Sequence, residues 1–520
     1  MATTNNRATF KKRTLDKDLD KLVHVEEATS LLARRLVAPG LGLLFLALAA
    51  VFASIYVIGE PRAVIIIAAA AIGAYMALNI GANDVANNVG PAVGAKALTL
   101  TGALVLAAIF ETAGALIAGG DVVGTISKGI IAPDAVASPE IFVRAMMAAL
   151  ISSALWVNLA TWIGAPVSTT HSVVGGVMGA GIAAAGFSTV DWSTMAQIAA
   201  SWVVSPVMGG VIAALFLAFI KTAIIYQDDK ITAARRWVPL LIAVMASAFT
   251  AYLAMKGLKK VVDIGNGTIA FLGIAAFAVV WALAHVHVRR RSQGMENRNQ
   301  SLRRLFNLPL VISAALLSFA HGANDVANAV GPLAAIVFTV EAGAVASEVA
   351  IPLWVMVIGA LGISFGLVLF GPKLIRMVGE QITKLNPMRA FCVALSAAIT
   401  VIVASGLGLP VSSTHTAVGA VFGVGFFREW YTARSKRRRA YLERRGKKMK
   451  VAQMANADAG PFSFLYEEEN GVPGISREEI ARRKLVRRAH VRTIVAAWLT
   501  TVPAAALLAA GVFLFLDALG

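Results

Sequence analysis

The chain has 520 residues, of which 58% are hydrophobic and only 15% charged, and its mean hydropathy is +0.73. A soluble domain is usually near half apolar with about a quarter of its residues charged, so an ordinary soluble domain is excluded. The formal net charge is +18, but the basic residues lie between apolar runs, as in the retained loops of membrane proteins. We therefore expect a membrane protein with no nucleic-acid partner.

Hydropathy along the chain predicts an all-α polytopic protein of the cell membrane (plasma or inner membrane) with about 12–13 membrane segments. A span of a lipid bilayer needs roughly 20 apolar residues. Residues 1–35 are polar and charged, which predicts a cytoplasmic tail and not a cleaved signal peptide. Thirteen apolar segments follow, near 36–58, 63–92, 98–120, 141–163, 165–188, 195–225, 237–255, 267–287, 309–337, 350–370, 388–407, 409–427 and 493–518.

Two motifs occur twice, in the same order. Ile80 to Ala95 reads IGANDVANNVGPAVGA and His321 to Ala335 reads HGANDVANAVGPLAA. Downstream, 165–179 reads APVSTTHSVVGGVMG and 409–423 reads LPVSSTHTAVGAVFG. The copies are offset by 241 residues in the first motif and by 244 in the second, so we infer an internal duplication.

The loop charges predict that the two halves have opposite orientations. With a cytoplasmic N-terminus and one crossing per segment, the basic loops fall inside, with Lys256 to Lys260 as the exception, and the loops 121–140 and 338–350, poor in Lys and Arg, fall outside. The two GANDVAN segments then run in opposite directions, as in the inverted repeats of transporters. The predicted parts are the tail 1–35, an extra transmembrane helix 36–58, repeat 1 at 63–225, a two-helix connector at 226–308, and repeat 2 at 309–520 interrupted by a basic cytoplasmic loop at 428–492.

The first motif places carboxylates and amides inside apolar segments, where ionisable groups are costly and usually functional. Carboxylate and amide oxygens suit hard cations, and the glycines and prolines beside them can break the helix and free backbone groups. The alternative is polar bonding between helices, which does not require the same cluster twice. We expect a site for Na⁺ or H⁺ at Asn83, Asp84, Asn324 and Asp325, with Asn87 and Asn328 nearby. Glu111 lies mid-span and is either a further cation or proton site or a structural carboxyl bonded to a neighbour.

The second motif places hydroxyl residues behind Pro-Val, a pattern that indicates a helix start. A helix N-terminus with free N–H groups is an anion site, whereas the plain alternative is capping and close packing. The segments 165–188 and 409–427 are therefore expected to be broken helices or hairpins. The hydroxyls are Ser168, Thr169, Thr170, Ser412, Ser413 and Thr414, and the histidines that follow, His171 and His415, are candidates for gating or for hydrogen bonding between helices.

An anion site beside carboxylates needs neutralising cations, because neither motif contains Lys or Arg. Cations bound at the aspartates would make anion binding depend on them, which favours symport over a passive channel. An intramembrane enzyme using Ser168 or Ser412 with His and Asp is a remote alternative, since catalysis needs one nucleophile and here both halves keep the cluster. A receptor that binds the anion without accumulating it is another.

The paired motifs resemble the signatures of the inorganic phosphate transporter (PiT) family, which includes sodium-dependent phosphate transporters. The likeness runs from about Ala63 to Leu516, apart from 428–492. It implies a non-enzymatic alternating-access symporter of inorganic phosphate, coupled to Na⁺ or, as second choice, to H⁺, with no other cofactor. It also implies that Asn83, Asp84, Asn87, Asn324, Asp325 and Asn328 take part in cation and phosphate binding, that the six hydroxyl residues hold phosphate, and that Glu111 matches a glutamate important in sodium-coupled members.

Two features depart from that pattern. Sodium-coupled relatives often carry a second glutamate in the later half, where this chain has Ala394, and an extra segment at 36–58 precedes the first repeat. A sulfate permease of the same family is the nearest alternative function, because sulfate is also a tetrahedral oxyanion. A site that uses the phosphate proton as a donor would reject sulfate. The expected partners are phosphate, Na⁺ or H⁺ and the lipid bilayer, with a homodimer as a further expectation.

Overall fold

The computed structural model describes residues 37–60, 62–131, 136–163, 167–345, 351–377, 385–434 and 488–519. The predicted N-terminal tail 1–35 and most of the predicted loop 428–492 lie outside these ranges. The described part is helical, without a β-sheet. After a first helix at Val37–Tyr56, the helices are α2 (Ala63–Asn83), α3 (Val85–Gly94), α4 (Leu100–Ala118), α5 (Gly120–Lys128), α6 (Pro139–Ile163), α7 (Thr169–Ala185), η2 (Phe187–Thr189), α8 (Trp192–Ile220), η3 (Lys221–Ile225), α9 (Lys230–Leu253), η4 (Ala254–Leu258), α10 (Lys259–Val261), α11 (Asn266–Arg291), α12 (Asn299–Leu305), α13 (Asn307–Ala342), α14 (Leu353–Met377), α15 (Pro387–Gly406), α16 (Ser413–Arg434) and α19 (Arg488–Ala518).

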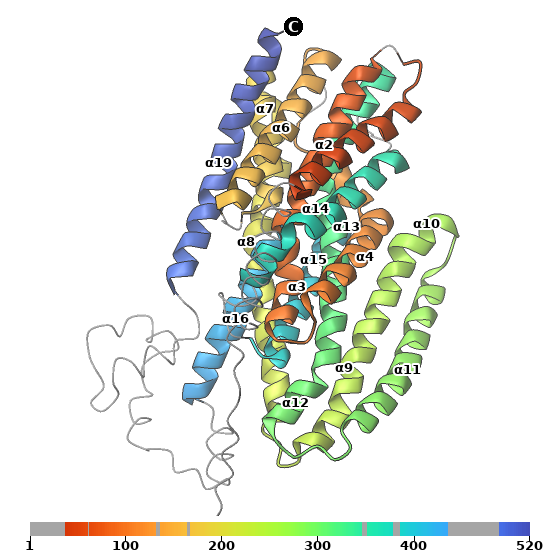
Figure 1. Ribbon diagram of the computed structural model, residues 1–520, viewed down its shortest axis with the longest axis vertical. Coiled ribbons are helices and arrows are strands. Elements are labelled where there is room, and N and C mark those ends of the chain that lie inside the picture. Colours follow the sequence, from red (N-terminus) through yellow and green to blue (C-terminus); the bar gives the residue numbers. More distant parts are fainter. Residues whose placement is uncertain are drawn as a thin grey trace, which may run out of the picture.

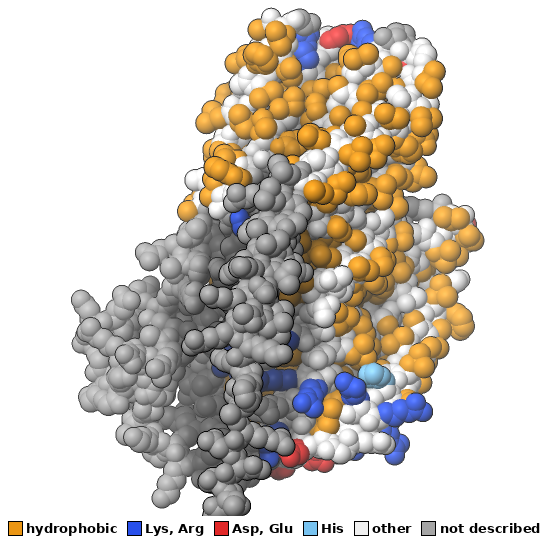
Figure 2. Space-filling model, viewed as in Figure 1, with side chains coloured by type: hydrophobic (Ala, Val, Ile, Leu, Met, Phe, Trp, Pro, Cys, Tyr) orange, Lys and Arg blue, Asp and Glu red, His pale blue; other side chains and the backbone are white. Residues whose placement is uncertain are grey.

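Eleven described helices are long and apolar enough to cross a membrane. They match eleven of the thirteen predicted segments, and the prediction of an all-α polytopic membrane protein is confirmed. The other two segments, 165–188 and 409–427, form α7 and α16, which are not among the eleven. Figure 2 shows apolar side chains over most of the visible surface and Lys and Arg gathered at its lower end, as expected for a protein surrounded by lipid.

α7 and α16 each belong to a helical hairpin. α6 packs beside α7, and α15 beside α16; in Figure 1 the first pair occupies the upper half and the second the lower half. α7 begins beside Asp84, which lies within the membrane segment Ala63–Gly94 and not at its end. Of these four helices, α6 and α15 are among those long enough to cross a membrane, whereas α7 and α16 are not, so one crossing per segment stays a prediction for the two hairpins. A hairpin returns the chain to its starting side, so the predicted sides of the later loops are unchanged.

The two GANDVAN segments differ in their backbone. The first is interrupted at Asp84, which separates α2 from α3, whereas the second runs unbroken through α13 from Asn307 to Ala342. Pro91 lies inside α3 and Pro332 inside α13. The expectation that the Gly-Pro pairs break the helix is therefore wrong, since neighbouring helices stabilise these segments.

Helices of each half pack against helices of the other half. α2 packs on α14 and α13 on α4, whereas α7 packs on α19 and α16 on α8. Glycines permit these contacts: a Cβ on Gly81 would collide with the carbonyl oxygen of Ile363, and one on Gly322 with that of Glu111. Small residues let helix backbones approach in this way in membranes. The matched contacts agree with the predicted inverted repeats and bring the middle of α2 and α13 together.

Candidate functional site

The site forms where the tips of the two hairpins meet. Ser168 and Ser412 cap α7 and α16, each hydroxyl oxygen accepting from the backbone N–H three residues on, at 3.1 Å from His171 N and 3.2 Å from His415 N. The Thr170 hydroxyl donates across to Val411 O at 3.2 Å. Both helix N-termini, which carry partial positive charge, therefore point to the centre of the molecule.

The two Asn-Asp pairs bind the hairpin tips in the same way. Asn83 Nδ2 donates to Asp84 Oδ1 and to Val167 O, both at 2.9 Å. Asn324 Nδ2 donates to Asp325 Oδ1 at 2.7 Å and to Val411 O at 2.6 Å. Both aspartates are buried. Each asparagine thus orients its neighbouring carboxylate and ties one tip to one half of the protein.

Hydroxyls from both tips converge on one carboxylate. Thr169 Oγ1 donates to Asp84 Oδ2 at 2.6 Å, and Thr414 Oγ1 to Asp84 Oδ1 at 3.1 Å. The other carboxylate, on Asp325, accepts from Ser413 Oγ at 3.4 Å. Since one of the two hydroxyls on Asp84 comes from each half, the site does not belong to either half alone.

The remaining two asparagines also reach across. Asn87 Nδ2 donates to Thr414 Oγ1 at 2.8 Å. Asn328 Nδ2 lies 3.2 Å from both Thr169 Oγ1 and Thr170 Oγ1. Amide groups of one half therefore hold the hydroxyls of the other half, and the eight residues expected to contact phosphate all lie at or beside the meeting tips.

Glu111 on α4 connects to the site through His321. Its Oε2 is 2.5 Å from His321 Nδ1, and its Oε1 accepts from Asn88 Nδ2 at 2.9 Å. His321 Nε2 lies 3.0 Å from Asp325 Oδ2. Glu111 and His321 are fully buried. A continuous polar chain therefore runs from α4 to the central carboxylates.

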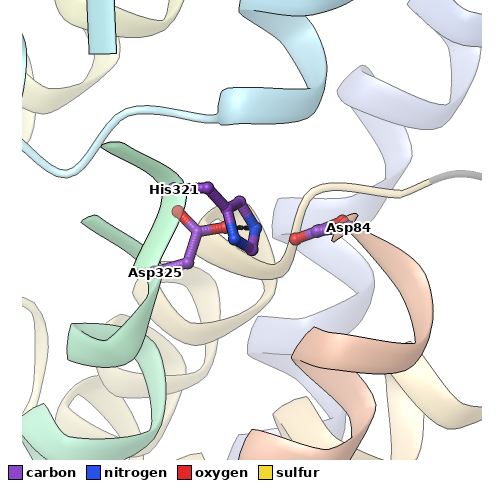
Figure 3. A group of neighbouring side chains, drawn as sticks. All are labelled: Asp84, His321 and Asp325. Carbon is purple, nitrogen blue, oxygen red and sulfur yellow. Dashed lines mark ion pairs between the residues drawn. The ribbon is translucent and has the colours of Figure 1, made fainter. Parts of the chain in front are cut away.

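His321, Asp84 and Asp325 form a group that could hold a cation, since each offers a ligand atom within 4.8 Å of the others. Figure 3 shows His321 and Asp325 on one helix, with Asp84 facing them from the other half. Sequence reasoning did not select His321. The signal was available, because the two motif copies differ at this position, with Ile80 in the first and His321 in the second.

Within this fold the residue of the other half that matches Glu111 is Ile363 on α14, and not Ala394, which lies on α15. Gly322 approaches Glu111 O as Gly81 approaches Ile363 O. Next along the chain, Thr112 Oγ1 and Ser364 Oγ are hydrogen bonded to each other at 2.7 Å. The polar pair Glu111–His321 is thus matched in the other half by the apolar residues Ile363 and Ile80.

The rings of His171 and His415, the candidates for gating, contact each other edge to face. Their ring centroids are 4.4 Å apart and the rings are nearly perpendicular, at 88°. The His171 ring also lies 3.9 Å from Trp202. They join the two hairpins on the side of α8, and the structure places them beside the hydroxyl residues.

Further hydrogen bonds hold the second tip. Lys256 Nζ donates to Asp121 Oδ2 at 2.5 Å and to Gly406 O at 3.2 Å. Thr125 Oγ1 donates to Gly408 O at 2.7 Å, and Trp202 Nε1 to Pro410 O at 3.2 Å. Side chains from α5, η4 and α8 therefore fix the carbonyl groups that precede the Ser-Ser-Thr segment.

The fold and site together define a polytopic membrane carrier with a central site between two hairpins. The chain belongs to the phosphate transporter family, whose model matches residues 80–509. It is a transporter and not an enzyme.

Similar proteins agree with this assignment. A Helicobacter pylori (strain J99) protein named "Putative phosphate permease" is 46% identical over 525 residues, covering 96% of this chain and 98% of its own. A Thermococcus kodakarensis protein of the same description is 38% identical over 358 residues, covering 69% of this chain and 87% of its own. The solved structure titled "The sodium-dependent phosphate transporter" is 33% identical, with a TM-score of 0.73, over 88% of this chain and all of that chain.

Proposed function

We propose that the protein is a symporter that moves inorganic phosphate together with Na⁺ by alternating access, with H⁺ as the second choice of coupling ion. The observation that carries this proposal is the convergence of Thr169 and Thr414, one from each hairpin, on the buried carboxylate of Asp84. The solved relative titled as sodium-dependent favours Na⁺. Sulfate is the competing substrate within the family.

Cations are needed because the site combines carboxylates with an anionic substrate. Two unit charges of the same sign 4 Å apart repel by about 4 kcal/mol at an effective dielectric constant near 20. That repulsion corresponds to roughly a thousandfold loss of affinity. In this proposal Na⁺ binds at Asp84, Asp325, Asn83 and Asn324, which removes the repulsion and makes phosphate binding depend on the cation.

Phosphate is then held by hydroxyls, amides and helix N-termini. Thr169, Thr170, Ser413 and Thr414 supply hydroxyls, and the N-termini of α7 and α16 supply N–H groups. Asn87 and Asn328 already bond these hydroxyls from the opposite half. Ser168 and Ser412 cap the helices, so their role is to hold the N-termini in place. Glu111 acts through His321 on Asp325.

Alternating access follows from the two hairpins. They approach the site from opposite ends of the molecule (Figure 1) and their tips contact each other there. Separation of one tip from the site would open it toward one end, while the other tip keeps the opposite end closed. Inverted repeats provide two such states of nearly equal energy.

The test is uptake of labelled phosphate into proteoliposomes containing the full-length protein. We expect uptake under an inward Na⁺ gradient to exceed uptake in K⁺ at least tenfold, and unlabelled sulfate in excess to compete weakly. Asp84→Asn should abolish uptake, whereas the surface variant Arg303→Gln, at an exposed position, should not. Uptake driven by a proton gradient without Na⁺ would replace Na⁺ by H⁺ in the proposal, and absence of uptake under both gradients would refute it.

A further inference from the structure

A cavity of about 650 Å³ lies at the basic end of the molecule, between α11 and α12. Four arginines contribute to its lining: Arg290, Arg291, Arg298 and Arg304. Glu296 is the carboxylate among the described lining residues, and its Oε2 is paired with Arg298 Nε at 2.6 Å. Within the described ranges Arg290, Arg291 and Arg304 form no ion pair and can face an anion. Guanidinium groups bind phosphate through paired N–H donors.

The loop that forms this cavity is held in place from outside it. Arg235 on α9 donates from Nε to Ser292 Oγ at 2.7 Å and from Nη2 to Ser292 O at 3.3 Å. Asn297 Nδ2 donates to Asp228 O at 2.6 Å. Gly294 has φ +69°, a left-handed conformation that glycine adopts without strain. The arginines are therefore carried by a built loop and not by a free chain end.

A second cavity of about 510 Å³ continues from the first and is mostly apolar. Arg290 and Arg291 line both cavities, and the second is completed by Leu283, Val286 and His287 on the outer face of α11. Leu283 is 66% exposed and Val286 47% exposed, although both lie in a membrane segment. Figure 2 shows the same change, from apolar surface to Lys and Arg, toward the lower end. A basic pocket thus opens into an apolar groove that faces lipid.

We propose that these two cavities bind one anionic phospholipid, with its phosphate on Arg290, Arg291 and Arg304 and an acyl chain along Leu283 and Val286. Basic pockets at membrane helix ends recognise anionic headgroups, and the groove supplies the contact that free phosphate lacks. The site is separate from the transport site and does not depend on the proposed Na⁺ coupling. It would anchor α11, whose apolar stretch is only 11% buried in the protein, to the membrane.

The experiment measures lipid binding to the purified full-length protein in detergent by native mass spectrometry. The probes are dioleoylphosphatidylglycerol and, as the neutral comparison, dioleoylphosphatidylcholine. The test variant combines Arg290→Gln, Arg291→Gln and Arg304→Gln. A matched control removes the same charge from neighbouring positions outside the cavity, by Arg236→Gln, Arg289→Gln and Arg303→Gln.

We expect the protein to prefer the anionic lipid at least tenfold, and the test variant to lose most of that preference while the control keeps it. An equal loss in both variants would show a general charge effect and overturn the proposal. Displacement of the lipid by millimolar inorganic phosphate would also overturn it, since the site would then hold free phosphate. Val286→Trp, at a position that is 47% exposed, is expected to weaken phosphatidylglycerol binding but not glycerol-1-phosphate binding. No effect on the lipid would refute the acyl-chain groove.

Discussion

Glu111 and His321 form a buried polar pair whose contribution to stability can be measured by replacing both with the residues found at the matching positions of the other half. Glu111 and His321 are fully buried, and removal of one member of a buried charged pair costs about 3–5 kcal/mol. Glu111→Ile also deprives Asn88 of its acceptor, which costs about 1–3 kcal/mol when the group stays buried. We therefore expect the single variant to lose at least about 3 kcal/mol of unfolding free energy.

The combination Asn88→Ala, Glu111→Ile and His321→Ile is expected to restore most of that loss. The duplication already has Ala329, Ile363 and Ile80 at the matching positions. An aspartate is compatible with an isoleucine four residues before it, as the first half shows. There Asp84 follows Ile80 by four residues and is hydrogen bonded by an asparagine and two threonines. Replacement of a buried pair by apolar residues of similar size is often neutral.

The measurement is unfolding by sodium dodecyl sulfate in mixed micelles, followed by circular dichroism, with phosphate uptake in proteoliposomes as the second readout. We expect the triple variant to be within about 1 kcal/mol of the natural chain, a coupling that additive effects do not produce, and to have lost at least tenfold in Na⁺-dependent uptake. Ile363→Glu, which places a carboxylate opposite Ile80, should be destabilised like the single variant. If the triple variant is less stable than Glu111→Ile alone, the pairing argument is refuted.

Three further predictions concern packing, the hairpin tip and a helix cap. Gly322→Ala places a Cβ against a carbonyl of α4 and should prevent folding into a stable protein in detergent, whereas Gly511→Ala, which meets nothing within 4 Å, should not; equal melting temperatures would contradict this. Lys256→Gln should cost at most about 1 kcal/mol, since the ion pair is partly exposed, yet increase hydrogen exchange at residues 406–411. Lys256→Arg, which keeps a cationic donor for Asp121 and for Gly406 O, should retain protection. At Asp191 the pKa is lowered because the backbone N–H of the third residue after it donates to the carboxylate. This hydrogen bond stabilises the start of α8 at pH values above 3.8, the ordinary pKa of aspartate, and the stabilisation is lost as the pH falls through the lowered pKa. Hydrogen exchange at the start of α8 should therefore rise in acid for the natural chain but not for Asp191→Asn.

Much of the membrane architecture was predictable from the sequence because helices satisfy their backbone hydrogen bonds locally. Each apolar run predicts a helix without reference to the rest of the chain, and eleven of the thirteen agree with spans. The hairpins were harder to place. α7 has only 17 residues, and a length near that of a span does not show whether a helix crosses or turns back. That depends on where its tip is held, here by Asn83.

The site residues were chosen from the sequence because the same polar groups recur twice inside apolar segments. Their grouping was not predictable in detail. Thr414 contacts Asp84 at a sequence separation of 330 residues, and His321 contacts Glu111 at a separation of 210. No local pattern states which half a side chain will touch. His321 was missed because a single histidine beside a repeated motif is hard to distinguish from a packing residue.

The sequence by itself determined that the chain lies in a membrane, that it is duplicated and which polar groups are candidates for the site, because hydropathy and repetition are properties of residue order. Only the tertiary structure decided that the halves exchange partners and that Ile363, not Ala394, matches Glu111. It also decided that Asp84 is shared by both hairpins. These features depend on close approach between distant helices, permitted by Gly81 and Gly322, and such contacts arise only when the whole chain has packed.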